Sequence, residues 1–374
     1  MQGSTSNLGA LVAAGGFVLA FIFGAVANRT NFCTMGAVSD VVNMGSWGRM
    51  RMWLLAIAVA ILGTHALQLG GQIDLTRSIY VRPNVTWLSY ILGGFLFGVG
   101  MTLGSGCGSK TLVRLGAGSL KSLVVFFFLG IAAYMTLKGL FAIWRTRWID
   151  PVATDLAAVH VPRQDLPTLI ATWTGASLPA VEGLVALVVA GALLAFVLKD
   201  RDFRGSFDHL LGGTVVGLVI VGGWYVTGHL GYGENPDTLE DTYFGTNSRT
   251  IESLSFTAPV GYVLELLMLW SDKSLTVTFG IAATLGIIAG SFAYAMLSRT
   301  FRWEGFAGAE DTANHVVGGL LMGFGGVTAL GCTIGQGLTG FSTLALGSIL
   351  SFAAIVAGAA LTMKVQYWRM ASET

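Results

Sequence analysis

The sequence predicts an all-α polytopic membrane protein. Apolar residues make up 53% of the 374 residues and charged residues only 11%, whereas a soluble domain carries about 25% charge. The apolar residues fall in blocks of about 18 to 25, which is long enough for a helix to cross a bilayer. The 52 glycines are typical of membrane helices that pack closely or break within the membrane.

Nine full spans follow from the positions of these blocks. We expect them at residues 8–27, 52–71, 88–103, 120–144, 180–198, 210–229, 275–297, 316–330 and 346–364. Four short interrupted helices are expected between them, near residues 29–42, 104–117, 250–270 and 331–345. The first 27 residues lack a basic segment and a small-residue cleavage site, so we interpret them as the first span and not as a removed signal peptide.

One stretch occurs twice and divides the chain into two halves. Gly93–Cys107 aligns without a gap to Gly318–Cys332, with seven identical residues in fifteen. We therefore expect a first membrane half at 1–148 (spans 1–4), an extramembrane connector at 149–179, a linking fifth span at 180–206 and a second half at 207–374 (spans 6–9). The halves begin an odd number of spans apart, which predicts an inverted, pseudo-symmetric repeat, a common plan among transporters.

All three cysteines lie at helix breaks rich in glycine. Cys33, Cys107 and Cys332 each follow a glycine by nine residues. A broken helix leaves N–H groups and a partial positive charge at its new N-terminus, and such ends bind anions. A neutral thiol is a weak, polarizable donor that suits a sulfur-bearing anion. Three breaks predict weak sites in series, which an anion can enter and still leave.

The residues around the breaks supply the other candidate contacts. Glycines permit close backbone approach, polar side chains donate hydrogen bonds and cations attract an anion. The candidate substrate-binding residues are Arg29, Cys33, Thr34, Gly106, Cys107, Gly108, Ser109, Lys110, Gly331, Cys332, Thr333 and Gln336. The three motifs hold no acidic residue apart from Asp40 at a margin, which favours an anion pathway over a cation pathway.

Other kinds of site have less support. The five histidines are scattered and do not have the spacing of metal ligands, so we interpret His65, His229 and His315 as hydrogen-bonded packing residues. No G-x-x-x-x-G-K-[ST] stretch is present, and a net charge of +1 offers no nucleic-acid-binding tail. We expect no metal, no cofactor, no nucleic-acid partner and no enzymatic activity.

Acidic residues near the fourth break have two readings. Glu265 lies inside an apolar segment, where an acid is either functional or part of a structural ion pair. Arg249 and Glu252 fit a solvated loop equally well. Their role stays open at this point.

Three motifs resemble the YeeE/YedE family of sulfur-compound transporters. They are NFCTMGAVSD at 31–40, GSGCGSKTLVRLG at 104–116 and GCTIGQGLTG at 331–340. The resemblance covers most of the chain and implies inward transport of thiosulfate across the bacterial inner membrane. It also implies an hourglass-like fold whose short helices meet at a central constriction, where Cys33, Cys107 and Cys332 pass the ion along through S–H contacts. A small cytoplasmic sulfur-carrier protein is implied as a possible partner.

We therefore expect a multi-pass protein of the inner membrane that takes up thiosulfate or a similar sulfur anion. Membrane lipid and that anion are its expected partners. One alternative is a membrane sulfur carrier or sulfurtransferase that forms a cysteine persulfide, with a thiolate activated by a helix N-terminus and Lys110. Others are a transporter of a selenium species and a purely structural subunit. The chain departs from the family by its connector at 149–178 and a polar insertion at 233–249.

Overall fold

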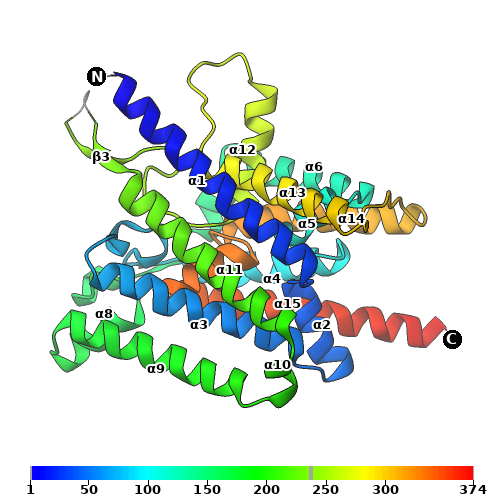
Figure 1. Cartoon of the computed structure of the whole chain (residues 1–374), viewed down its shortest axis with the longest axis horizontal. Coiled ribbons are helices and arrows are strands. Elements are labelled where there is room, and N and C mark those ends of the chain that lie inside the picture. The colour runs from blue at the N-terminus through cyan, green and yellow to red at the C-terminus, as the bar shows by residue number, and fades with distance from the viewer. Residues whose placement is uncertain (1, 236–238, 374) are drawn as a thin grey trace.

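Long helices joined by short ones form the whole molecule (Figure 1). The computed structural model describes residues 2–235 and 239–373. The long helices are α1 (Gln2–Arg29), α3 (Gly48–Leu69), α4 (Trp87–Leu103), α6 (Leu120–Leu137), α9 (Leu178–Leu198), α11 (Phe207–Tyr225), α13 (Phe279–Leu297), α14 (Ala309–Thr328) and α15 (Leu346–Glu373).

Shorter elements connect these helices. The short α-helices are α2 (Thr34–Met44), α5 (Gly108–Gly116), α7 (Leu140–Trp144), α8 (Leu166–Thr174), α10 (Arg201–Gly205) and α12 (Thr257–Met268). The 3-10 turns are η1 (Leu75–Arg77), η2 (Ile79–Val81), η4 (Leu156–Val159) and η7 (Phe341–Thr343), and the π-helical turns are η3 (Arg145–Ile149), η5 (Val226–Leu230) and η6 (Gly335–Gly340). Two antiparallel strand pairs join β1 (Asn84–Val85) to β2 (Thr154–Asp155) and β3 (Tyr232–Glu234) to β4 (Asp241–Tyr243).

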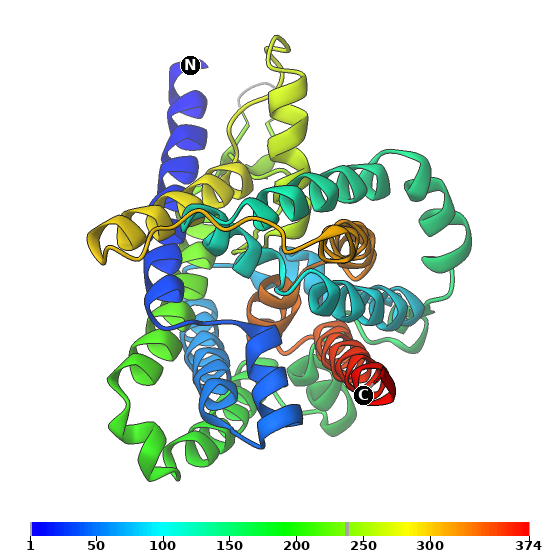
Figure 2. The ribbon, with the colours of Figure 1, turned by 90° about the vertical axis from the view of Figure 1, so that its right-hand side faces the viewer.

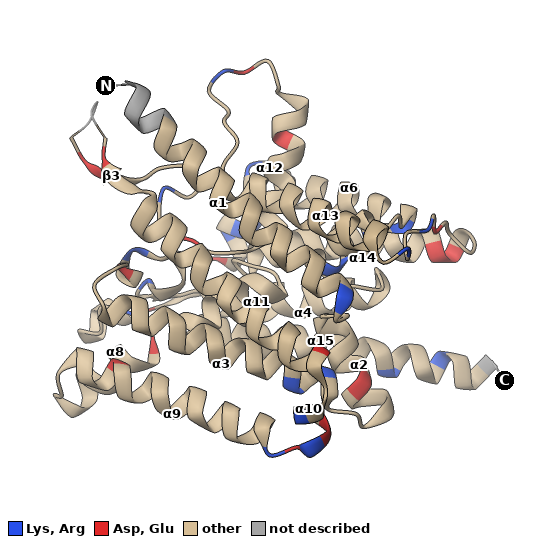
Figure 3. Ribbon diagram, viewed as in Figure 1, with Lys and Arg blue, Asp and Glu red and all other residues tan. Residues whose placement is uncertain are grey.

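The prediction of an all-α polytopic membrane protein is confirmed. Eight stretches of the described residues are long and apolar enough to cross a membrane, and they match eight of the nine predicted spans. The ninth, at 316–330, lies in α14, a 20-residue helix. α14 is not among the eight because its first two turns are polar, with Glu310, Asp311 and His315. Figure 3 marks the charged residues on the ribbon and shows them mostly at the helix ends, with long uncharged stretches between them.

The four predicted interruptions all occur. They correspond to α2, α5, α12 and the pair η6–η7. One boundary differs, because the predicted span at 120–144 ends at Leu137 and continues after Gly139 as the separate helix α7. A Cβ at Gly139 would lie 2.9 Å from the Cα of Met135, so only glycine allows the chain to turn there.

The two halves are inverted relative to one another. The repeated stretch forms α4 in the first half and α14 in the second, and these helices cross closely. A Cβ on Gly93 would lie 2.7 Å from the carbonyl oxygen of Gly325, and one on Gly100 would lie 2.7 Å from that of Gly318. Since Gly93 aligns with Gly318 and Gly100 with Gly325, the two equivalent helices run antiparallel about a pseudo-two-fold axis.

The other helices obey the same symmetry. α1 packs on α13 while α11 packs on α3, and α4 packs on α15 while α14 packs on α6. Each contact therefore has a counterpart in which the halves are exchanged. Figure 2 looks nearly along α14 (orange) and α15 (red) and shows the short helices after Cys332 (dark orange) in the middle of the molecule. This arrangement brings segments far apart in sequence to one central region.

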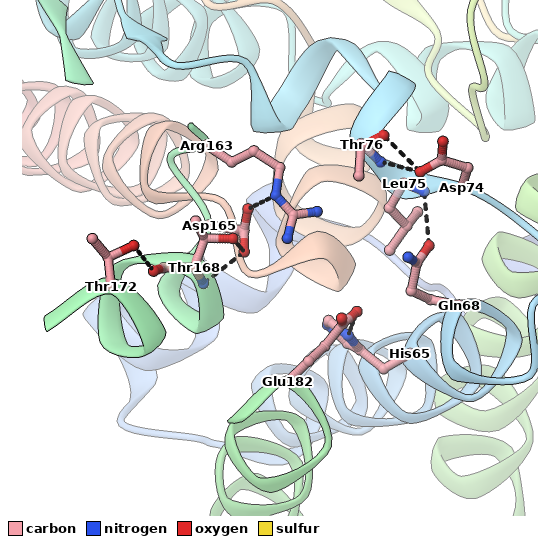
Figure 4. Close-up of polar contacts among 10 residues, drawn as sticks. All are labelled: His65, Gln68, Asp74, Leu75, Thr76, Arg163, Asp165, Thr168, Thr172 and Glu182. Carbon is pink, nitrogen blue, oxygen red and sulfur yellow. Dashed lines mark hydrogen bonds and ion pairs between the residues drawn. The ribbon is translucent and has the colours of Figure 1, made fainter. Parts of the chain in front are cut away.

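Helix α9 lies at the edge of the bundle, where α3 is its main long neighbour (Figure 1). A buried pair joins the two helices: the Nδ1 atom of His65 lies 3.0 Å from a carboxylate oxygen of Glu182 (Figure 4). The reading of His65 as a hydrogen-bonded packing residue is confirmed. The pair ties the linking helix to the first half inside the membrane.

The connector folds back onto the second half. Its Gln164 is fully buried; the backbone N–H of Leu346 donates to the Gln164 carbonyl at 3.0 Å and that of Gly347 to its side-chain oxygen at 3.0 Å. Asp165 caps α8 and lies 3.3 Å from Arg163 (Figure 4). The connector therefore anchors the start of α15. The domain boundaries and the extramembrane place of this segment stay predictions.

Candidate functional site

Each cysteine follows a helix that ends in the same way. The residue two positions before the cysteine has a left-handed backbone: φ is 52° at Asn31, 56° at Ser105 and 59° at Leu330. The next N–H then bonds to the carbonyl five residues earlier, in the pairs Phe32–Ala27, Gly106–Met101 and Gly331–Gly326. This is the Schellman helix ending. The left-handed residue is not a glycine at any of these three breaks, so the sequence-based emphasis on glycine located the breaks but not the residue that makes the turn.

The cysteine itself begins the next helix at each break. The backbone N–H of Gly36 donates to the Cys33 sulfur at 3.4 Å, and that of Gly335 donates to the Cys332 sulfur at 3.4 Å. The N–H of Lys110, also the third residue after its cysteine, faces the sulfur of Cys107. Each sulfur therefore accepts a backbone N–H at the start of its helix, as an N-cap side chain does.

The three thiols lie together in one buried row. Cys33 and Cys107 contact one another through their thiol groups. On its other side Cys107 faces the hydroxyl of Thr333, the residue after Cys332, and its sulfur lies 3.3 Å from the Ser109 hydroxyl. All three cysteines are buried, and Cys107 neighbours both Cys33 and Cys332.

A basic cavity reaches the thiol row at Cys33. Its volume is about 420 Å³. Its charged lining residues are Arg49, Lys110, Arg114, Arg302 and Glu304. Arg49 is paired with Asp40, and the lining still carries more positive than negative charge. Arg114 also donates to the Ser105 carbonyl at 2.7 Å, which satisfies a backbone group freed by the break. This cavity attracts anions.

A second cavity reaches the row near Cys332. Its volume is about 180 Å³, and it is lined by Ser255 and Gly331 together with Tyr80, Arg145, Glu252 and Tyr262 among others. The Ser255 hydroxyl lies 4.0 Å from the Cys332 sulfur, and the N–H of Phe256 donates to that sulfur at 3.4 Å.

The two cavities open at opposite ends of the bundle. The basic cavity is lined at Ser119, just before α6, and at Thr300, just after α13. The second cavity is lined at Leu137, the last residue of α6, and at Phe279, the first residue of α13. Two cavities separated by a buried row of thiols give the hourglass-like form that the family resemblance implies.

The remaining predicted contact residues divide into two groups. Gly106, Gly108, Ser109, Lys110, Gly331 and Thr333 lie at the thiol row or its cavities. Thr34 begins α2, and its buried hydroxyl has no hydrogen-bond partner among the described residues. The Gln336 side chain donates to the Ala329 carbonyl and so braces the third break.

Arg29 does not reach this site. Its guanidinium lies 3.1 Å from Asp208 and over the Phe207 ring, and it lines a neighbouring hollow that shares Asn31 and Arg49 with the basic cavity. The first turn of α11 therefore holds Arg29 away from the thiols. The arginines that line the basic cavity are instead Arg49, Arg114 and Arg302. Of these, Arg49 comes from α3 and Arg302 from the loop before α14. Arg49 and Arg302 were not predicted as contact residues because they lie far from the cysteine motifs in sequence. The predicted inverted repeat was nevertheless a signal that remote segments meet.

Other side chains singled out in the sequence serve packing or ion pairs. Glu265 lies 2.8 Å from Lys138 and accepts from Tyr134 at 2.9 Å, which favours the structural reading of this acid. The ring of His229 lies 3.2 Å from the Gln72 carbonyl and that of His315 lies 2.7 Å from the Asp311 carbonyl. Among the described residues, no group of three or more His, Cys, Asp or Glu side chains is placed to hold a metal ion.

An inverted repeat of membrane helices with a buried polar row between two opposed cavities defines a membrane transporter. The comparisons with known proteins agree with this class. The chain belongs to the sulphur transport family, whose model matches residues 29–361. It is similar to the thiosulfate transporter TsuA of Escherichia coli (strain K12), with 26% identity over 86% of each chain. It is also similar to the thiosulfate transporter TsuA of Spirochaeta thermophila, with 26% identity over 90% of this chain and 93% of the relative.

Proposed function

We propose that this protein carries thiosulfate or a closely similar sulfur anion across the bacterial inner membrane. The sulphur transport family supports a sulfur compound as the substrate. The two similar proteins that are named thiosulfate transporters support thiosulfate in particular. The observation that carries the proposal is the row of three buried thiols between two cavities at opposite ends of α6 and α13.

The anion would first enter the basic cavity. Lys110 and Arg114 lie there beside Cys33 and the left-handed Ser105. Their charges raise the local anion concentration and replace part of the water shell that the ion loses. The N-terminus of α5, where Gly108 is the first helical residue, adds N–H groups with partial positive charge.

The three thiols would then bind the ion one after another. An S–H group donates weakly and is polarizable, which matches the terminal sulfur of thiosulfate better than the hard oxygens of sulfate. Cys33, Cys107 and Cys332 would donate in turn, with Ser109 and Thr333 as hydroxyl partners beside Cys107. Because each contact is weak, no single position would trap the ion.

Uptake by the purified protein in liposomes tests this function. Labelled thiosulfate should exchange rapidly across the bilayer, while sulfate, sulfite and selenite compete poorly. Faster movement of selenite would instead identify a selenium transporter. Release of sulfite on the entry side, with sulfur retained on a cysteine, would support the persulfide carrier.

A small soluble sulfur-carrier protein is the expected recipient on the cytoplasmic side. The charged ends of the helices offer polar surface for such a contact (Figure 3). Affinity capture with the full chain in detergent tests it, and a capture that requires thiosulfate would tie the partner to transport.

A further inference from the structure

The wall of the second cavity carries two hydroxyl groups beside Cys332. The Ser255 hydroxyl lies 4.0 Å from the Cys332 sulfur, and Tyr80 on η2 lines the same cavity. Both hydroxyls approach Gly335, whose N–H donates to that sulfur at 3.4 Å. A Cβ on Gly335 would lie 2.6 Å from the Ser255 oxygen and 3.5 Å from the Tyr80 oxygen. The two hydroxyls and the thiol therefore meet around one glycine, and a side chain there would collide with them.

The ring of Tyr80 is held in place on several sides. The Ser78 hydroxyl accepts the N–H of Tyr80 at 3.3 Å. The ring meets that of Trp224 edge to face, with centroids 6.3 Å apart, and a Cβ on Gly340 of η6 would lie 2.9 Å from its Cδ1 atom. The Tyr80 side chain is only 4% exposed. Its hydroxyl is therefore positioned before a ligand arrives, which lowers the entropic cost of binding.

The Tyr80 hydroxyl can donate to a ligand in this cavity. The described residues offer it no hydrogen-bond partner. Arg145, which also lines the cavity, pairs with Asp150 at 3.2 Å. The carboxylate of Glu252 accepts from Ser248 at 2.8 Å. These two charged groups of the wall have opposite signs and partners of their own, whereas a buried hydroxyl without a partner favours a ligand that accepts from it.

Hydroxyl and thiol donors together suit the two ends of thiosulfate. The ion has a terminal sulfur at one end and oxygens at the other. An O–H group is the stronger donor and matches the oxygens, while the polarizable S–H group matches the sulfur. An anion whose sulfur contacts Cys332 would direct its oxygens toward the neighbouring hydroxyls, and its negative charge strengthens these hydrogen bonds.

We propose that the hydroxyls of Tyr80 and Ser255 bind the oxygens of the anion while Cys332 contacts its terminal sulfur. This inference rests on the proposed function and adds a binding site for the anion at the second cavity. Its donors are neutral, in contrast to the cations of the basic cavity. Neutral donors hold an anion less tightly than cations do, so the site can fill and empty during transport.

Equilibrium exchange of labelled thiosulfate by the full-length protein in liposomes tests this site. Equal concentrations on both faces give one half-saturation concentration, whichever way the protein is inserted. Tyr80→Phe retains the packed ring and removes only the hydroxyl. It should raise the half-saturation concentration about tenfold or more, as expected for the loss of a hydrogen bond to a charged group, without lowering the maximal rate. Ser255→Ala should change the half-saturation concentration in the same direction.

Tyr243→Phe provides the matched control. Tyr243 on β4 is also 4% exposed, but it lines a different hollow together with Arg77 and Tyr232. This variant should exchange thiosulfate like the unaltered protein.

Two results would overturn the inference while exchange stays intact. One is an unchanged half-saturation concentration in Tyr80→Phe, even if its melting temperature falls, because the hydroxyl would then serve only the fold. The other is an equal rise in Tyr243→Phe. Absence of exchange by the unaltered protein would instead overturn the proposed function together with this inference. If Tyr80→Phe does not fold, Ser255→Ala decides, and an unchanged half-saturation concentration in that variant would overturn the inference.

Discussion

Gly100 of α4 and Gly318 of α14 face one another at the centre of the bundle. A Cβ on either residue would lie 2.7 Å from the carbonyl oxygen of the other. Gly318 aligns with Gly93, and the contact of Gly93 with Gly325 repeats the same relationship at the other end of the crossing. The two halves are thus joined through backbone contacts that admit no side chain.

Alanine at Gly100 or Gly318 should therefore destabilise the protein. The added methyl group forces two backbones apart, which costs roughly 1–3 kcal/mol for overpacking. Thermal unfolding of the purified variants in detergent measures the effect. Gly191→Ala in α9 is the control, because no described atom beyond the adjacent backbone of its own helix lies within 4 Å of the position that its added methyl group would occupy. An equal loss of stability there would contradict this account.

Replacement of Cys107 should have the largest effect on transport among the thiols. Cys107 is the middle member of the row and contacts Cys33, Ser109 and Thr333. Loss of one donor to an anion corresponds to roughly 1.5–3 kcal/mol, or more than about tenfold in rate. Growth on thiosulfate as sole sulfur source and liposome uptake both measure it for Cys107→Ala.

The Cys107→Ser variant tests whether the site needs a polarizable sulfur or only a hydrogen-bond donor. Serine retains an O–H donor of similar size but loses the polarizable sulfur. We expect uptake by Cys107→Ser to stay well below that of the unaltered protein. Full activity would show that the site needs only a donor.

Lys110→Gln should weaken capture of the anion without altering the fold. Lys110 lines the basic cavity and lies 3.4 Å from the side-chain oxygen of Asn31. Removal of one cation at this mouth should raise the KM for thiosulfate by about tenfold, equivalent to about 1.4 kcal/mol, and should reduce the dependence on ionic strength. Lys199→Gln, an exposed change after α9, is the control. An unchanged KM would mean that the anion does not use this cavity.

The pair His65–Glu182 should show strong coupling in a double-mutant cycle. Either residue replaced alone by leucine leaves the other polar group buried without its partner, which costs roughly 1–3 kcal/mol. The double change to leucine should recover most of this loss. Thermal unfolding of the two single variants and the double variant measures the coupling. Additive effects would show that the contact does not hold α9 to α3.

The pH dependence of stability provides a check on the pKa of Glu252. Because the pKa is raised from 4.5 to about 7 on folding, the folded state binds the proton more tightly than the unfolded state. The stabilisation from that proton is complete below pH 4.5 and is lost as the pH rises through 7. The melting temperature of Glu252→Gln, which does not titrate, should therefore rise relative to the unaltered protein between pH 5 and 8. A constant difference across this range would refute the raised pKa.

Much of the fold follows from the sequence because its signals are local. Apolar blocks mark the spans, and the gapless match of Gly93–Cys107 to Gly318–Cys332 reveals the repeat. The polar start of α14 lies outside its predicted span, because its first residues, including Glu310, are exposed at the end of the helix.

The site was harder to predict because its partners come from remote segments. Arg49 and Arg302 meet the cysteines only through the crossing of the halves, and Arg29 is drawn to Asp208, 179 positions away. Glu252 fits a solvated loop until the fold places it beside Ser255 at the second cavity. Contacts at such separations depend on the tertiary arrangement, which residue spacing does not encode.

The fourth break completes the symmetry of the backbone but not of its chemistry. Phe256 begins α12 as Cys33 begins α2, and it offers Cys332 its N–H where a cysteine would offer a thiol. Because the pseudo-two-fold arrangement carries an odd number of cysteines, its two cavities differ. One is basic, and the other is lined by the acid Glu252. The protein should therefore show different apparent affinities for the anion on its two sides.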